Sequence, residues 1–435
     1  MSTSRRTILV LAYSISPVRG SEYAVGWNYV RHMSRDHDLV VLYGLAGDHM
    51  GDVEEMANVS SDAFGGHVTF VPVLPDRRAR LANYLNRTGH VPFSFYVAYR
   101  YWHLSALAAA RRIMAERQID IVHYLCPIGF REPGYLWKLG KPYIWGPVGG
   151  IAARPVRAFR DLGRAEGILT VVRNAVNAVQ FRAPRVRQGI LKADVLLAAT
   201  TENARAIERV YGRKAIVVPE NAIDSDPGAS DPGDVLPGED SSPEAAHGPL
   251  RMVWIGTLET RKAITILLRA LARLDPSRSW VLDVIGNGPL MESAREEAAA
   301  LGIAGPITWH GKLPRANAIA LLGKADLHVL TSLAEANTTV LWEAMGAGVP
   351  TMAIDHCGMH DSICNACGIR IPLSGIEEMS ASFATAISQL IDDRTVLAEL
   401  SEGARACALD HGWQRRTAFW QEIYDHAIAV HGAAR

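Results

Sequence analysis

Two glutamates eight positions apart lie in the stretch Leu330–Pro350, where a predicted strand runs into a loop and then a helix. Glu335 falls in the loop and Glu343 falls on the helix. Loop N–H groups and a helix N-terminus attract an anion, and carboxylates accept hydrogen bonds from sugar hydroxyls. The arrangement suits a sugar attached to a phosphate, although most glutamate pairs at this spacing are solvated surface.

A basic pair follows a second predicted strand, Met252–Ile255. The strand ends in Gly256 and Thr257, and Arg261 and Lys262 are expected to open the next helix. Glycine lets a ligand approach the backbone closely, and the two cations could neutralise a diphosphate. Because cations are disfavoured at a helix N-terminus unless an anion is present, the pair favours a ligand over a solvated first turn.

Short apolar β-branched runs alternate with helical patterns along the whole chain, which is typical of parallel strands buried on both faces. The sequence therefore predicts a doubly wound α/β architecture that occurs twice. The predicted strands are 7–13, 39–43, 68–73, 119–124, 143–145, 195–199, 216–218, 252–255, 281–285, 307–310, 327–330, 350–354 and 369–371. Proline, glycine and acidic residues dominate 221–249 and predict a flexible linker or loop there. The predicted parts are a Rossmann-like domain (1–220), this linker (221–249), a second Rossmann-like domain (250–411) and a C-terminal helix (412–435) that packs back toward the first domain.

The composition excludes disorder as a description of the whole chain: 49% of its 435 residues are hydrophobic, 21% are charged and ten are tryptophan. The net charge of zero hides a split, because the first 215 residues carry 29 Lys+Arg against 17 Asp+Glu. The remainder has the opposite excess, so two domains with different partners are expected. Nine basic residues are interleaved with valine, leucine and isoleucine between Arg154 and Lys192. That segment fits an anionic membrane surface, with a solvated protein face as the open alternative, whereas no motif supports a nucleic-acid partner.

The five cysteines do not form a disulfide framework, which indicates a reducing, cytoplasmic compartment. Ser4–Leu9 resembles a twin-arginine export signal, but a buried strand explains Thr7–Tyr13 and no cleavage site follows. Gly286-Asn287-Gly288 lacks the third glycine of a dinucleotide fingerprint. No nicotinamide or flavin cofactor is therefore expected.

The order of these motifs resembles the retaining GT-B glycosyltransferases of family 4. The matching positions are Lys262, Gly286–Pro289, His310-Gly311, Ala325-Asp326, Glu335 with Glu343, Asn221–Asp224, Trp413 with Tyr424, and Gly20-Ser21-Glu22. The resemblance implies two Rossmann-like domains facing a cleft, with a nucleotide-sugar donor held mainly by the second domain and the acceptor by the first.

The resemblance also implies roles for individual residues. Lys262 would bind the donor diphosphate, with Arg261 as a second positive charge. Glu335 would bind the sugar hydroxyls and Glu343 the ribose hydroxyls. The other positions expected to bind the donor are Gly20, Ser21, Gly256, Thr257, Asn337, Thr338 and Thr339.

The chain departs from the family pattern at three places. One is Ala336-Asn337, which follows Glu335 where the family commonly has Gly-Phe and so affects which sugar is expected. Thr257 stands where the family often has arginine, and Leu125 stands where it often has a histidine, which leaves His123 as a structural residue. On the acceptor side, Arg131 and Glu132 are weak candidates because they are polar groups in a turn-like stretch.

Two metal hypotheses are disfavoured. Cys364 and Cys367, with His356, Cys357 and His360 nearby, offer zinc ligands, but His356 and Cys357 follow a strand where the family has a glycine-rich turn. The Asp-x-Asp pairs at 36–38 and 224–226 fall in a turn and in the linker. No metal and no cofactor are therefore expected.

The resemblance predicts a retaining, metal-independent hexosyltransferase that uses a nucleotide-diphosphate sugar and a lipid-linked or polysaccharide acceptor. It would serve bacterial cell-surface polysaccharide synthesis in the cytoplasm, with peripheral attachment to the inner face of the membrane. Two alternatives stay open, because fold alone does not fix chemistry. They are a nucleotide-sugar epimerase or hydrolase, and a non-catalytic nucleotide-sugar-binding protein.

Overall fold

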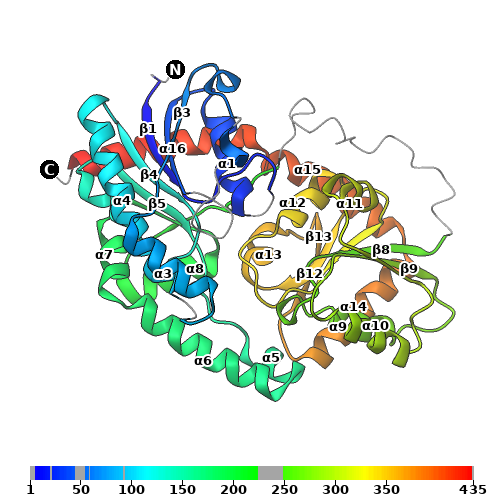
Figure 1. Cartoon of the computed structure of the whole chain (residues 1–435). Coiled ribbons are helices and arrows are strands. Elements are labelled where there is room, and N and C mark those ends of the chain that lie inside the picture. The colour runs from blue at the N-terminus through cyan, green and yellow to red at the C-terminus, as the bar shows by residue number, and fades with distance from the viewer. Residues whose placement is uncertain are drawn as a thin grey trace. The chain divides into compact units, whose positions relative to one another are not determined.

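The computed structural model describes residues 5–19, 22–44, 54–57, 59–91, 94–223 and 248–433. The chain divides into two compact units, each built around a parallel β-sheet (Figure 1). The first unit comprises Met1–Ala152, Val176–Asn221 and Arg416–Arg435, and the second comprises Ala153–Ala175 and Ala222–Arg415. The predictions for Gly20, Ser21 and linker residues 224–247 lie outside the described residues.

In the described part of the first unit the sheet has seven strands. They are β1 (Thr7–Ala12), β2 (Asp38–Tyr43), β3 (Val68–Pro72), β4 (Ile121–Cys126), β5 (Tyr143–Val148), β6 (Val195–Ala198) and β7 (Ile216–Val217). The helices are α1 (Glu22–Met33), α2 (Glu54–Ala57), α3 (Arg77–Arg87), α4 (Phe95–Glu116), α7 (Pro184–Lys192), α8 (Thr201–Tyr211) and most of α16 (Trp413–Ala433). One further helix, α6 (Arg164–Phe181), has residues in both units.

The described part of the second unit has a six-stranded sheet. Its strands are β8 (Leu250–Ile255), β9 (Trp280–Ile285), β10 (Ile307–Gly311), β11 (Leu327–Leu330), β12 (Thr351–Asp355) and β13 (Gly368–Pro372). Its helices are α5 (Val156–Leu162), α9 (Thr265–Leu271), α10 (Met291–Ala300), α11 (Arg315–Leu322), α12 (Thr339–Gly346), α13 (Cys357–Ser362), α14 (Ile376–Asp392) and α15 (Thr395–Asp410), with the one-turn 3-10 helix η4 (Thr260–Lys262) before α9.

Both sheets have the strand order of a doubly wound fold. The first runs β3-β2-β1-β4-β5-β6-β7 and the second runs β10-β9-β8-β11-β12-β13, and neighbouring strands of the described residues pair in parallel. In each sheet the order reverses beside its first strand, between β1 and β4 and between β8 and β11. Open α/β sheets bind ligands at the carboxyl ends of their strands at such a reversal. The predicted fold of two Rossmann-like domains is confirmed.

Successive strand residues of the second sheet face two different hydrophobic cores. Met252 and Trp254 lie in a core with α9, α10 and α14, whereas Val253 lies in a core with α11 and α12. The same alternation appears in β12, where Met352 faces the first of these cores and Ala353 faces a third, formed by α12, α13 and α15. Helices therefore cover both faces of this sheet (Figure 1), which explains why its strands read as continuous apolar runs.

The sequence pattern places residues 153–175 in the first domain (1–220), whereas in the structure they group with the second unit. Phe159 of α5 is buried in the core of the second unit, and Arg157 forms an ion pair with Glu378 of α14. The first unit instead includes α16, whose Tyr424 hydroxyl is hydrogen-bonded to the hydroxyl of Tyr29 in α1. Among the described residues, no helix combines the length and the apolar character needed to cross a bilayer.

Candidate functional site

Two loops meet at the strand-order reversal of the second sheet. One follows β8 and carries Arg261 and Lys262, and the other follows β11 and carries Glu335. The two strands are adjacent, with Leu327 paired to Met252. The structure brings the three charged residues together: Lys262 Nζ and an Arg261 guanidinium nitrogen both form an ion pair with the same oxygen, Glu335 Oε1. The Lys262 side chain is only 9% exposed and that of Glu335 is 12% exposed.

Backbone and side-chain hydrogen bonds fix these loops to one another. Leu333 N–H donates to the Arg261 carbonyl over 2.8 Å. The Thr331 hydroxyl donates to the Lys262 carbonyl over 2.7 Å and accepts from the indole N–H of Trp254 over 3.0 Å. Because the indole and hydroxyl are buried, this chain of bonds sets the backbone position from which Lys262 projects.

Arg261 and Lys262 do not open a helix, contrary to the sequence prediction. They end the one-turn helix η4, and α9 begins only at Thr265, after Ala263 adopts a left-handed conformation with φ 45°. Neither cation therefore lies at the N-terminus of α9, where a positive charge would be unfavourable. The two cations are instead stabilised by carboxylates, since Arg261 is also paired with Glu259 over 2.7 Å.

The Gly-x-Gly sequence after β9 packs against the loop that follows β8. A Cβ on Gly286, which has φ +133°, would lie 1.9 Å from the Gly256 carbonyl oxygen, and one on Gly288 would lie 2.4 Å from that of Leu258. Leu258 N–H donates to the Asn287 carbonyl over 3.1 Å. These glycines are needed for close contact between two loops of the site. Thr257, which follows Gly256 in the β8 loop, is exposed.

The loop before α12 contributes backbone groups at its helix start. Thr338 is the N-cap of α12, and its side chain makes no capping hydrogen bond, so Thr339 begins the helix without a side-chain cap. The preceding Asn337 is held by the last residue of α13, because the Ser362 hydroxyl donates to its side-chain oxygen over 3.4 Å. A Cβ on Gly358 would lie 1.7 Å from the backbone oxygen of Ala336. The loop that leads into α12 is thus closely packed from the side of α13.

Glu343 lies on α12, whereas Glu335 lies in the loop that precedes this helix. The Glu343 side chain is 16% exposed. Arg315 of α11 contacts it, with both Nε and Nη2 3.0 Å from Glu343 Oε1. No sequence signal linked these two residues, since they are 28 positions apart on different helices. Arg315 orients the carboxylate and adds a cation to this edge of the site.

His328 in β11 lies behind the basic pair and was not identified from the sequence. Its side chain is fully buried, and Nδ1 lies 3.1 Å from the Thr351 hydroxyl. Burial, together with the positive charge of Lys262, lowers the pKa of His328 to about 3. The imidazole is therefore neutral at ordinary pH. In the described loops after β8 and β11, the positive charges are those of Arg261 and Lys262.

In the first unit, Arg131 and Glu132 have partners within the protein. Glu132 is 3% exposed and is paired with Arg100 over 2.8 Å and with Arg185 over 3.2 Å. Arg131 donates to the side-chain oxygen of Asn177 over 2.6 Å. Glu132 thus connects the loop after β4 to α4 and α7, and Arg131 connects the same loop to α6. These contacts explain why polar residues stand in this turn-like stretch.

A carboxylate occupies the strand-order reversal of the first sheet. Glu22 opens α1, directly after Gly20 and Ser21, and its Oε1 accepts from the backbone N–H of Ile128 over 3.2 Å. Ile128 follows β4, the strand beside β1. Burial raises the pKa of Glu22, and the Ile128 hydrogen bond opposes that effect in part. Glu22 is therefore a carboxylate held at the edge of the first sheet where the strand order reverses.

His123 lies in the middle of β4 and not at its end. Its Nε2 is 3.0 Å from the Gly146 carbonyl oxygen, and its ring contacts those of Tyr29 and Trp420. Burial lowers the pKa of His123 to about 4, so the side chain is a neutral part of the packing between the sheet, α1 and α16. Leu125, two residues on, is also buried in the strand.

The residues of the zinc hypothesis separate into different environments. His360 pairs with Asp355 over 2.7 Å, and Cys357 is buried in the core formed by α12, α13 and α15. Cys364 and Cys367 instead gather with Cys407, which the sequence reasoning did not include.

Comparison with known proteins shows what the second unit and the fold of the chain are similar to. Residues 239–406, which include the Lys262 and Glu335 loops, match the family model "Glycosyl transferases group 1". The fold is that of GT-B glycosyltransferases, because the chain aligns over 98% of its length with all of sucrose-phosphate synthase from Thermosynechococcus elongatus, at a TM-score of 0.66 and 14% identity.

Two further proteins are similar to this chain. D-inositol 3-phosphate glycosyltransferase of Nocardia farcinica is 29% identical over 346 residues, which are 72% of this chain and 74% of that protein. The structure of HepE from Anabaena in complex with UDP and glucose covers 97% of this chain and 100% of its own, with a TM-score of 0.57 and 15% identity.

Proposed function

We propose that the protein is a retaining, metal-independent glycosyltransferase that takes a hexose from a nucleotide-diphosphate sugar. The observation that carries the proposal is the meeting of Lys262, Arg261 and Glu335 at the strand-order reversal of the second sheet. Two cations at this edge match the charge of a diphosphate, and a carboxylate beside them matches sugar hydroxyls. The match to the glycosyl transferases group 1 model and the UDP and glucose bound by HepE support a nucleotide-sugar donor.

The ion pairs define what the donor would have to replace. Glu335 forms ion pairs with both cations in this structure, and Glu259 also pairs with Arg261, so a diphosphate would compete with these carboxylates for Lys262 and Arg261. The carboxylate released in this way would be available to accept hydrogen bonds from the sugar. Binding of the diphosphate and orientation of the sugar are therefore coupled through one side chain.

In the proposed reaction the bond between the anomeric carbon and the phosphate oxygen breaks, and a bond to an acceptor hydroxyl oxygen forms on the same face of the sugar. The acceptor proton passes to the leaving phosphate. Lys262 and Arg261 stabilise the negative charge that develops on the diphosphate, with the backbone N–H groups at the start of α12, and no metal is required.

We infer further that the acceptor is a lipid-linked or polysaccharide intermediate and that the protein works at an anionic membrane surface. The support comes from α6, which exposes an apolar stripe: Ile168 is 66% exposed, Val172 54%, Val176 49% and Val179 72%. Their spacing of four, four and three residues places them on one face of the helix. Positive charge that anionic lipid attracts comes from exposed arginines on and near this helix. They are Arg164 in α6, Arg182 directly after it and Arg187 in α7.

A thermal-shift panel of UDP-, GDP- and ADP-sugars tests the donor proposal. We expect sugars of one base to raise the melting temperature by about 5 °C at saturating concentration, since ligand at 100 times its Kd stabilises by about 2.7 kcal/mol. No shift with any nucleotide sugar contradicts the proposal. A donor-only assay then separates the alternatives: release of free sugar or of an epimer without acceptor indicates a hydrolase or epimerase, and binding without turnover on any acceptor indicates a non-catalytic protein.

A further inference from the structure

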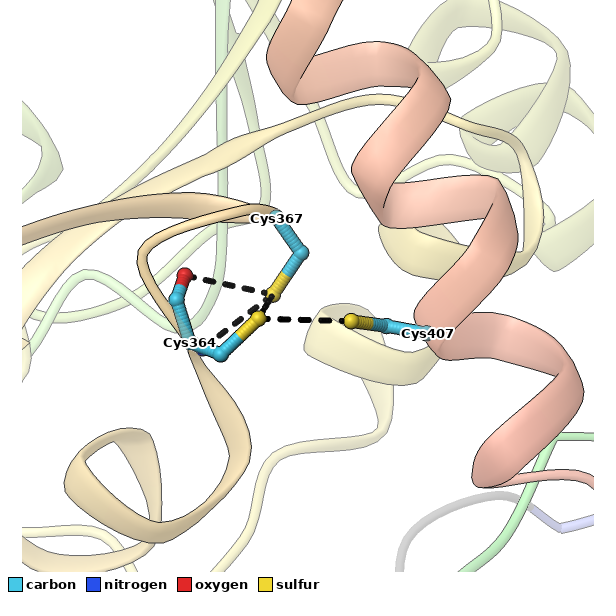
Figure 2. A group of neighbouring side chains, drawn as sticks. All are labelled: Cys364, Cys367 and Cys407. Carbon is cyan, nitrogen blue, oxygen red and sulfur yellow. Dashed lines mark hydrogen bonds between the residues drawn. The ribbon is translucent and has the colours of Figure 1, made fainter.

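Three cysteines of the second unit point their sulfur atoms toward one another (Figure 2). Cys364 and Cys367 lie on the loop between α13 and β13, and Cys407 projects from α15. The Sγ atom of Cys364 is 3.4 Å from that of Cys367 and 3.4 Å from that of Cys407. All three sulfurs lie within 4.8 Å of one another.

The fold holds these cysteines in place from two sides. Within the loop, the backbone N–H of Cys364 donates to Cys367 Sγ over 3.2 Å. On the helix, Gly403 lets α15 approach the loop, because a Cβ there would lie 1.7 Å from the Ala366 carbonyl oxygen. Cys407 is four residues beyond Gly403 and so lies on the same helix face. The close contact at Gly403 therefore directs Cys407 at the loop.

The three cysteines differ in their access to solvent. Cys364 is the exposed member of the group, Cys407 is partly exposed and Cys367 is buried. An ion can therefore reach the cluster from solvent at Cys364.

We propose that Cys364, Cys367 and Cys407 form a binding site for a thiophilic divalent metal ion of the zinc type. Zinc bonds to sulfur at about 2.3 Å, which in a tetrahedral site places the sulfurs about 3.8 Å apart. The sulfurs here are spaced between 3.4 Å and 4.8 Å, so small rotations of the side chains produce that geometry. Three thiolates leave the fourth position to water.

A disulfide is the competing outcome, and the geometry favours the metal. A disulfide joins two sulfurs and leaves the third thiol without a role, whereas all three thiols converge here. The bound ion would link the loop before β13 to α15. It would also brace the end of α13, where Ser362 contacts Asn337 in the loop that leads into α12. The proposed role is structural, and it does not depend on the proposed transfer reaction.

Zinc titration of the full-length protein tests the site. The protein is purified under reducing conditions, treated with a chelator and titrated with Zn²⁺ against a chromophoric competitor, and melting temperature is followed in parallel. We expect one zinc per chain and a higher melting temperature. Cobalt substitution should give a sulfur-to-metal charge-transfer band in the near ultraviolet.

Matched variants locate the ion. Losing a residue that only supports a metal ligand already costs about 10–100-fold in affinity, so Cys407→Ser and Cys364→Ser should each weaken zinc binding at least that much. Cys126→Ala, which removes a buried thiol of the first unit, should bind zinc as the wild type does. The proposal is overturned if the reduced wild type binds no stoichiometric zinc, if Cys407→Ser binds it equally well while remaining folded by circular dichroism, or if the thiols only form a disulfide on exposure to peroxide.

Discussion

Lys262 and Glu335 form an ion pair across the two loops that leave the adjacent strands β8 and β11. Arg261 contacts the same carboxylate oxygen and is also paired with Glu259. Two carboxylates therefore balance the two cations at an edge where α/β sheets bind their ligands. A diphosphate that binds there would compete with these carboxylates for Lys262 and Arg261.

Removing the lysine should separate catalysis from folding. Lys262→Ala should lower turnover by about 10²–10³-fold, the range seen when one group that stabilises transition-state charge is lost. The melting temperature should change little, because the alanine leaves Arg261 to pair with Glu335. Lys312→Ala, at an exposed lysine after β10, is the control. Near-normal sugar transfer by Lys262→Ala contradicts the proposed role.

Neutralising the carboxylate should have an effect that depends on the ligand. Glu335→Gln leaves two partly buried cations without their shared partner, and breaking a buried pair costs about 3 kcal/mol. UDP should restore part of that loss, because its diphosphate supplies the missing negative charge. Melting curves with and without UDP measure this directly. An equal loss in both conditions would show that the diphosphate does not reach these cations.

The glycine contact between the β8 and β9 loops should be intolerant of any side chain. Gly286→Ala places a methyl group 1.9 Å from the Gly256 oxygen and forces an L residue to φ +133°. Overpacking costs about 1–3 kcal/mol and the positive φ adds about 1–2 kcal/mol. Denaturant unfolding should show the loss, whereas Gly305→Ala, which meets nothing within 4 Å, should be close to neutral. A stable Gly286→Ala protein would mean that these loops can separate.

Acid should destabilise the first unit through a buried histidine. Burial lowers the pKa of His103 to about 3, far below its usual 6.5. The unfolded chain therefore binds a proton that the folded chain does not, and stability falls as pH drops from about 6.5 toward 3, by about 1.4 kcal/mol per pH unit for one such group. His103→Leu should reduce the fall of the denaturation midpoint between pH 6.5 and 4.5 by the contribution of one group, since His123 and His328, whose pKa values are also lowered, still contribute. His90→Leu, at an exposed position, should leave the slope unchanged.

The apolar stripe of α6 should control association with membranes. Replacing Ile168, Val172 and Val179 together by serine should abolish flotation with vesicles that contain anionic lipid, without lowering the melting temperature, since all three side chains are largely exposed. Vesicles of neutral lipid alone should bind the wild type weakly, because the surface charge is then missing. Equal flotation of the variant and the wild type would remove α6 from the proposed membrane surface.

The doubly wound fold could be predicted from the sequence because buried apolar strands alternate with helical patterns along the whole chain. Strands such as Ile121–Cys126 are buried on both faces, and a run of this kind has few other interpretations. The end of each predicted element was less certain: the pattern placed a helix start at Arg261, where the chain in fact makes a short turn before α9. One residue with positive φ, Ala263, creates that interruption, and alanine gives no signal for it.

The site was predictable only as far as its motifs are local in sequence. Glu335 and Lys262 could be named because each ends a recognisable strand-and-loop pattern. Arg315 could not be linked to Glu343, nor Cys407 to Cys364, because those contacts arise from helices that pack side by side and leave no fixed spacing in the chain. Likewise, the turn-like sequence around Arg131 did not indicate that its side chain donates a hydrogen bond to Asn177.

The helix α16 gives the chain an order of assembly. Its residues from Arg416 onward belong to the first unit, where Tyr424 meets Tyr29, yet they are synthesised after the whole second unit. On the ribosome the second unit can therefore complete its core while one face of the first sheet still lacks its cover. The first unit becomes whole only once α16 has left the ribosome, so loss of the part of α16 that carries Tyr424 should act as a folding defect at Tyr29, 395 positions upstream.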